Sequence, residues 1–288
     1  MSDDNIDTGA SEGGRTGGSA LKALVSFFTI WHMDIDQGDM DAMERNFGLV
    51  PIVGLLFGAA IIVAMTILDY INITQGYGSG VLFAVVVLAI VYAGSKFIHF
   101  DGLTDFGDGM IVSGTREDHV RALKDTLVGA GGIGVALVVV LLSVAVYGTA
   151  GLMLLVFAPI AEILVKNAMV AAAAYGEPGH GMAGRQVSMT TTNSLVVSTV
   201  ISLVLSLVVA LVASMIYNAM PMGNVEFDSV LFCIVFGTVV SVIAGYLMAR
   251  KANSVFGMVN GDILGATNEL SRPFIMLVMI LPYVCWLG

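Results

Sequence analysis

The sequence is poor in charged residues and in cysteine. Only 12% of its 288 residues are Asp, Glu, Lys or Arg, and it contains two cysteines. Two cysteines are too few for a disulfide framework or a cysteine-rich zinc site. Basic residues are scarcer than acidic ones, 12 against 22, and the net charge of −10 argues against nucleic acid as a partner.

Several common catalytic patterns are also missing. The sequence has no Walker-type loop, no Gly-x-Ser-x-Gly elbow and no Cys/His metal-binding pattern. Its first residues lack the charged, apolar and small-residue regions of a cleaved signal peptide, so none is expected. Residues 1–19 are instead rich in Gly, Ser and Asp, which predicts a disordered tail.

Long apolar segments are abundant. Hydrophobic residues make up 57% of the chain, and a transmembrane helix needs about 20 in succession. We distinguish seven segments: residues 47–68, 81–98, 128–147, 152–174, 194–217, 229–249 and 273–286. Only residues 148–151 separate the third from the fourth, so six or eight spans are alternatives. The sequence predicts an all-α, polytopic membrane bundle of about seven transmembrane helices.

All basic residues fall on one side of these spans. The connections near residues 69–80, 148–151 and 218–228 contain neither Lys nor Arg. The other connections and the N-terminal region carry all of them: Arg15, Lys22, Arg45, Lys96, Arg116, Arg121, Lys124, Lys166, Arg185, Arg250, Lys251 and Arg272. By the positive-inside rule that side is cytoplasmic. We therefore expect a multi-pass protein of the cell membrane with a cytoplasmic N-terminus.

This topology also bears on two smaller features. Residues 21–31 are apolar but too few to cross a bilayer, so we expect an interfacial or re-entrant helix there. Cys233 and Cys285 both fall near the outer face. They could form a single disulfide, or each could serve as a small apolar side chain.

Three aspartates follow the second span. Asp101, Asp105 and Asp108 are spaced by four and three residues. On a helix they lie within an arc of about 60°, so they share one face. Clustered carboxylates repel one another unless a cation lies among them, and Mg²⁺, which usually binds together with substrate phosphates, suits such a site. The alternative is a solvated acidic loop that caps the span.

Cations accompany these carboxylates. Arg116 and Lys124 lie in the same connection, and a metal beside phosphate-binding cations is typical of phosphoryl-type transfer. Glu162 and Lys166 are four residues apart at the end of the fourth span. Either they form an internal ion pair, or Lys166 points toward an anionic substrate.

The last cytoplasmic connection carries further polar residues. Asp262 and Glu269 are seven residues apart and lie close to one helical face. His99 lies on the helical face opposite Asp101, so it could act as a general base only if the helix breaks. Four residues are expected to form one stripe of a single helix: Arg250, Asn253, Gly257 and Asn260.

Together these motifs resemble the cobalamin synthase family. Residues 99–109 match the family pattern His-x-Asp-Gly-Leu-x-Asp-x-x-Asp-Gly. Three further stretches correspond in order and spacing: residues 124–129, 166–169 and 261–269. Thr126 replaces the usual Ser. The family's N-terminal pattern Phe-Leu-Thr-Arg-x-Pro is only partly present at residues 27–30, where its Arg is missing. The resemblance extends over residues 20–288, which we expect to form a single transmembrane catalytic domain.

The resemblance implies a transferase of the last steps of cobalamin biosynthesis. A hydroxyl of α-ribazole or α-ribazole 5′-phosphate would attack the cobinamide-side phosphorus of adenosylcobinamide-GDP, and GMP would leave, with Mg²⁺ required. The implied metal ligands are Asp101, Asp105 and Asp108. The implied catalytic residues are Asp105, His99, Asp262 and Glu269, and the implied phosphate-binding residues are Arg116, Lys124, Lys166 and Arg250. Membrane lipid is a further expected partner, and a homo-oligomer is possible.

Two other functions fit parts of the sequence. CDP-alcohol phosphatidyltransferases also place clustered aspartates on membrane helices, but their motif has an Ala-Arg pair that is absent after Gly102. A solute transporter could contain charged residues such as Glu162 and Lys166 within its spans. Transporters, however, place such groups near the bilayer midplane, whereas here the polar residues are expected to gather at one membrane face.

Overall fold

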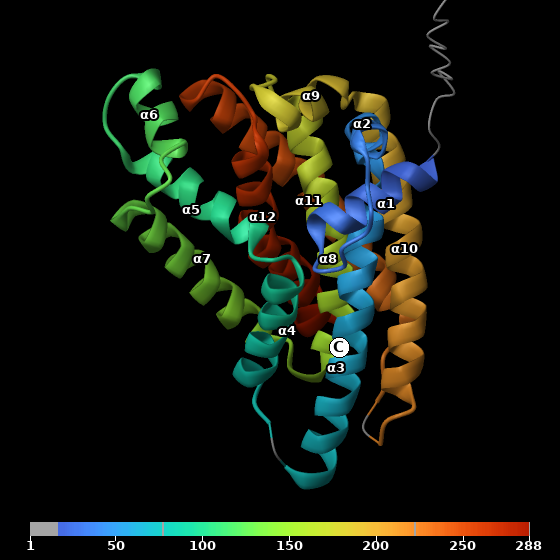
Figure 1. Ribbon diagram of the computed structural model, residues 1–288. Coiled ribbons are helices and arrows are strands. Elements are labelled where there is room, and N and C mark those ends of the chain that lie inside the picture. Colours follow the sequence, from blue (N-terminus) through green and yellow to red (C-terminus); the bar gives the residue numbers. More distant parts are fainter. Residues whose placement is uncertain (1–16, 77, 222, 288) are drawn as a thin grey trace, which may run out of the picture.

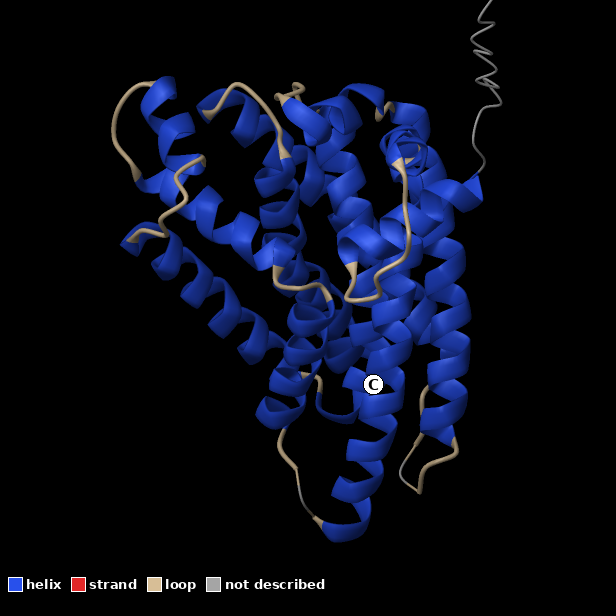
Figure 2. Ribbon diagram, in the orientation of Figure 1, coloured by secondary structure: helices blue, strands red, loops and turns tan. Residues whose placement is uncertain are grey.

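The computed structural model describes residues 17–76, 78–221 and 223–287. The described residues fold into helices, and Figure 2 shows the loops that join them. In order they are α1 (Gly17–Phe28), α2 (Gln37–Arg45), α3 (Pro51–Gln75), α4 (Gly80–Gly94), α5 (Ile98–Ile111), α6 (Arg116–Leu123), α7 (Ala130–Thr149), α8 (Leu154–Tyr175), α9 (Gly181–Met189), α10 (Thr192–Asn218), α11 (Phe227–Val255) and α12 (Gly261–Pro282) (Figure 1). The predicted tail lies outside the described residues up to residue 16, and residues 17–19 already belong to α1.

The predicted membrane bundle is confirmed. Among the described residues, six helices are long and apolar enough to cross a membrane: α3, α7, α8, α10, α11 and α12. Helices α4 and α5 together qualify as one further span, although they are bent by 94° relative to each other. The structure therefore supports six or seven spans.

Helix α8 lies at the centre of the bundle. All its residues from Leu154 to Ala173 are buried, against α3, α10, α11 and α12. Small residues of the neighbouring helices allow this close approach. A Cβ atom on Gly54 of α3 would lie 2.4 Å from the carbonyl oxygen of Glu162, and one on Gly245 of α11 would lie 2.3 Å from that of Ala168.

The expectation of one continuous helix over residues 81–98 is wrong. Helix α4 ends at Gly94 and α5 begins at Ile98, with Lys96 and Phe97 in the left-handed region at φ of 54° and 57°. The end of α1 stabilises this break. The Ile30 N–H donates to the Gly94 carbonyl oxygen at 2.8 Å, and Lys96 Nζ donates to the Ser26 carbonyl oxygen at 3.2 Å. The Gly94 carbonyl at the break and the Ser26 carbonyl near the end of α1 are thereby paired, as a bundle interior requires.

The expected single stripe from Arg250 to Asn260 is also wrong. Helix α11 ends at Val255, and Gly257 turns the chain at a φ of 71°. Asn260 then caps α12, because its side chain accepts a hydrogen bond from the Ile263 N–H at 3.1 Å. The last span therefore begins at Gly261 rather than at residue 273, and Glu269 is buried within this span instead of lying in the connection before it.

The two cysteines lie on α11 and in the short π-helical turn Tyr283–Leu287 that follows α12. Both are free thiols, Cys233 buried and Cys285 exposed. The alternative of a disulfide between them is therefore wrong.

Candidate active site

Helix α5 presents the three predicted aspartates on one side. It is continuous from Ile98 to Ile111, so the spacing of Asp101, Asp105 and Asp108 places them on a common face. Asp101 is exposed, whereas the other two are partly buried. The Asp105 carboxylate interacts electrostatically with both neighbours and also with Asp262. The acidic cluster thus contains four carboxylates from two helices.

Close packing of α12 on α5 brings Asp262 to this cluster. The backbone of Asp262 lies against Gly102, where a Cβ atom would be 2.7 Å from the Asp262 carbonyl oxygen. Gly265, one turn further along α12, lies similarly against the His99 backbone. Asn260 Nδ2 donates to Asp262 Oδ2 at 2.7 Å. This hydrogen bond orients the carboxylate at the first turn of α12.

Asp108 has a structural partner that the sequence did not indicate. Its two carboxylate oxygens accept hydrogen bonds from the backbone N–H groups of Gly129 and Gly132, at 2.6 and 2.7 Å. These groups belong to the start of α7, where a carboxylate satisfies unpaired N–H donors and favours the positive end of the helix dipole. Asp108 therefore anchors α7 to α5.

The remaining carboxylates suit a hard divalent cation. In the described part of the chain, no group of three or more His, Cys, Asp or Glu side chains is already arranged to hold a metal ion. Mg²⁺, however, commonly binds through one or two carboxylates and completes its shell with water and substrate phosphates. Asp101, Asp105 and Asp262 supply this chemistry, so these residues fit the predicted ion.

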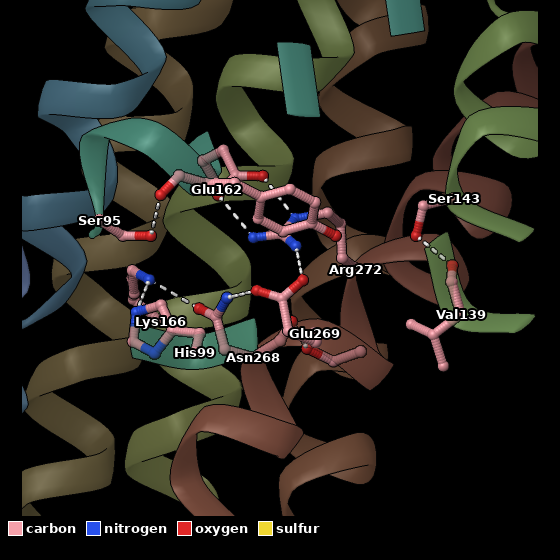
Figure 3. A network of polar contacts seen from close by, with 11 residues as sticks. Ser95, His99, Val139, Ser143, Glu162, Lys166, Asn268, Glu269 and Arg272 are labelled. Atoms are coloured by element: carbon pink, nitrogen blue, oxygen red, sulfur yellow. Dashed lines mark hydrogen bonds and ion pairs between the residues drawn. The ribbon is translucent and has the colours of Figure 1, made fainter. Parts of the chain in front are cut away.

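A chain of buried polar side chains lies beside the cluster (Figure 3). Lys166 Nζ of α8 lies 2.8 Å from His99 Nε2 of α5 and donates to Asn268 Oδ1 of α12 at 2.7 Å. Asn268 Nδ2 donates to Glu269 Oε1 at 2.9 Å, and Glu269 also forms an ion pair with Arg272. The network therefore ties three helices together in the interior of the bundle.

Arg272 connects the network to Glu162 of α8. Its Nε donates to Glu162 Oε1 at 2.8 Å, and both side chains are fully buried. The alternative of an internal ion pair between Glu162 and Lys166 is thus wrong, because each has a different partner. Two carboxylates are balanced by one guanidinium and one ammonium group, as burial of charge requires. Sequence reasoning missed Arg272 because it assigned the residue to a loop.

Burial divides the predicted site residues into a group inside the bundle and a group that borders the cleft. Lys166 and Glu269 are 0% exposed and do not line the cleft described below. His99 lies between the groups: it stacks on Phe28 with ring centroids 5.5 Å apart, contacts Lys166 and borders the cleft. Lys166 and Glu269 are thus placed to act through their neighbours, and their predicted direct roles stay predictions.

Asp101 and Asp262 of the acidic cluster border a cleft of about 180 Å³. It lies between α1, α5, α8, α9 and α12, and α9 lies near α2 at one end of the bundle (Figure 1). The titratable residues that line the cleft are His99, Asp101 and Asp262. Helix α9 contributes Gln186 to the lining, a residue that the sequence did not single out.

The predicted phosphate-binding cations lie around this region. Lys124, at the end of α6, is exposed and interacts electrostatically with Asp262. Arg116, at the start of α6, is also exposed, and its guanidinium lies against Gly257. Arg250 is exposed on α11 and does not line the cleft. Of these three cations, Lys124 thus interacts with a carboxylate of the acidic cluster.

A salt bridge fixes α9 beside the cleft. Arg185 donates to Glu44 of α2 through Nε and Nη2, at 2.9 and 2.7 Å. The hydrogen bonds to Glu44 raise the pKa of the Arg185 guanidinium, so this pair stays charged. Arg185 thus has a structural role that holds one wall of the cleft.

A second hollow begins on the other side of Asp101. It has a volume of about 560 Å³ and lies between α4, α5 and α7. Its lining is almost entirely apolar: Tyr92, Phe97, Phe100, Thr104, Val128, Ile133, Ala136, Leu137 and Val140 accompany Asp101. Asp101 therefore borders both the small cleft and the larger apolar hollow.

The fold and these contacts define a polytopic membrane protein with a carboxylate-lined cleft near one end of its helical bundle. Residues 20–280 match the family described as cobalamin-5-phosphate synthase. The chain belongs to this enzyme family, as its motifs predicted. No solved structure matches the chain.

Curated relatives that share one name match most of the chain in sequence. The adenosylcobinamide-GDP ribazoletransferase of Methanosarcina mazei is 25% identical over 287 residues, covering 90% of this chain and 91% of the relative. The protein of the same name from Methanocella arvoryzae is 29% identical over 265 residues, covering 88% and 92%. That from Thermococcus gammatolerans is 26% identical over 279 residues, covering 93% and 100%.

Proposed function

We propose that the chain joins adenosylcobinamide-GDP to α-ribazole or its 5′-phosphate and releases GMP. Its membership of the cobalamin-5-phosphate synthase family supports this reaction. The observation that carries the proposal is the electrostatic interaction of Asp105 with Asp101 and Asp262, the two carboxylates that border the cleft. Such a set of carboxylates suits a reaction in which a diphosphate is bound and cleaved.

In the proposed reaction, the ribazole hydroxyl oxygen forms a bond to the cobinamide-side phosphorus, and the bond from that phosphorus to the bridging oxygen breaks. The electron pair of that bond leaves with GMP. When bound, Mg²⁺ would neutralise charge on the diphosphate. Asp101, Asp105 and Asp262 would hold the ion, and Asp262 would accept the hydroxyl proton. Lys124 and Arg116 neutralise the departing phosphate.

We further propose that the cleft faces the cytoplasm. Apart from Lys166 and Arg272, which are buried within α8 and α12, the Lys and Arg residues fall on one side of the predicted spans, and the positive-inside rule makes that side cytoplasmic. A nucleotide-activated substrate would then reach the cleft from the cytoplasm of a cell whose plasma membrane holds the protein. The apolar hollow beside Asp101 would contact the bulky corrinoid or membrane lipid.

The direct test is GMP release by the purified protein in detergent or liposomes. We expect release with adenosylcobinamide-GDP and α-ribazole together, dependence on added Mg²⁺, and loss on chelation. Asp105→Asn should lose at least about 10²-fold in rate, because it removes charge where the ion and diphosphate meet. Ser188→Ala, on an exposed part of α9, is the matched control. Wild-type protein that releases no GMP from these substrates would refute the proposal.

A further inference from the structure

Gln186 lines the cleft and has a buried side-chain amide group. The residue is 4% exposed and lines the cleft from α9. Its buried Nε2 atom has no hydrogen-bond partner among the residues that the structure describes. Burying an amide group without a hydrogen-bond partner costs free energy. A buried amide of this kind therefore indicates a partner outside the described residues. Since the side chain borders the cleft, a ligand in that cleft can be this partner.

The geometry of α9 holds the amide in place. Met182, Ala183 and Gln186 share the face of α9 that lines the cleft. Arg185 holds the same helix to Glu44 of α2, and Val187 packs into the core. The amide is therefore carried by an anchored helix rather than by a mobile loop, which suits a residue that discriminates between ligands.

The walls of the cleft suit a flat ring system. Phe27, Phe28, Met169 and Met182 provide aromatic and thioether surface, and both favour contact with an aromatic ring. The volume of about 180 Å³ is smaller than the roughly 300–1,000 Å³ of pockets for drug-sized ligands. The cleft thus accommodates one heterocyclic base rather than a corrin ring. Asp101 and Asp262 border the same cleft, where the phosphates of such a nucleotide would meet them.

We propose that this cleft binds the guanine base of the GDP-activated donor, with Gln186 hydrogen-bonded to the edge of the base. The inference rests on the proposed function, in which two substrates carry a base. Guanine offers donors and acceptors along one edge and complements a carboxamide, which has both. The benzimidazole-type base of α-ribazole offers only a ring nitrogen. A site with a buried amide selects for the ligand that pairs it.

The experiment measures GMP binding, which needs no turnover. Wild-type protein in detergent is titrated with GMP and AMP by calorimetry, in the presence of Mg²⁺, beside Gln186→Met and the control Ser188→Ala. We expect the wild type and the control to prefer GMP. Gln186→Met should bind GMP roughly tenfold more weakly, as for the loss of one hydrogen bond, and should lose its preference over AMP. In the full reaction its KM for the donor should rise while its KM for α-ribazole stays unchanged.

A second variant covers the case in which Gln186→Met does not fold. Ala183→Leu fills the cleft and keeps the amide, and it should weaken GMP binding at least tenfold with an unchanged thermal midpoint. Unchanged GMP affinity in both folded variants would overturn the inference. A raised KM for α-ribazole with unaltered GMP binding would instead assign the cleft to the acceptor base. Failure of the proposed function is seen separately, as absence of GMP release by the wild type.

Discussion

The contact between Gly102 and Asp262 gives a sharp test of the site. In Gly102→Ala, the added Cβ atom would lie 2.7 Å from the Asp262 carbonyl oxygen and 2.9 Å from its Cα atom, whereas ordinary contact begins at 3.4 Å. Both obstructing atoms are backbone, so no side chain can rotate away. Helices α5 and α12 must separate by roughly 0.5 Å or more to restore normal contact. That movement draws Asp262 away from Asp101 and Asp105.

We expect this substitution to reduce the rate of GMP release between about tenfold and 10²-fold, since misplacement of about 1 Å can cost 10²-fold. Alanine favours a helix over glycine by roughly 1 kcal/mol, so local helix propensity does not oppose the change. The assay compares kcat at saturating substrates, with folding checked by thermal unfolding in detergent. Gly134→Ala on α7 is the matched control, because a Cβ atom there meets nothing within 4 Å.

The expected result is slow but folded Gly102→Ala beside fully active Gly134→Ala. Increased Mg²⁺ should restore part of the lost rate if the separation weakens ion binding. Gly102→Ala with wild-type kcat and wild-type Mg²⁺ dependence would refute the idea that close approach of α12 to α5 builds the site.

Two further predictions concern buried contacts. Arg272→Met removes the partner of Glu162 and Glu269, so the free energy of unfolding, measured by chemical unfolding, should fall by about 3–5 kcal/mol. The double variant with Glu162→Gln should recover part of this loss. Equal stability of the single variant and the wild type would contradict the prediction. Asp108→Ala removes the cap of α7 and should destabilise the protein by about 1 kcal/mol in the same measurement. Asp108→Asn keeps an acceptor oxygen and should retain more GMP release than Asp105→Asn; equal losses would indicate that Asp108 is a metal ligand.

Local regularity explains which features could be predicted. Six of the predicted spans correspond to long apolar helices, because bilayer thickness imposes a length that is visible in the sequence. The shared face of Asp101, Asp105 and Asp108 follows from helical periodicity alone. The break after Gly94 could not be read this way, because contacts with the end of α1 support it.

The sequence by itself determined the membrane class, the helical segments and the acidic face of α5, since hydropathy and periodicity are properties of neighbouring residues. Only the tertiary structure decided that Glu162 pairs with Arg272 and that Asp262 joins Asp101 at the cleft. These pairings join residues far apart in the chain. They depend on how closely small residues let two helices approach, and that distance is a property of the packed bundle.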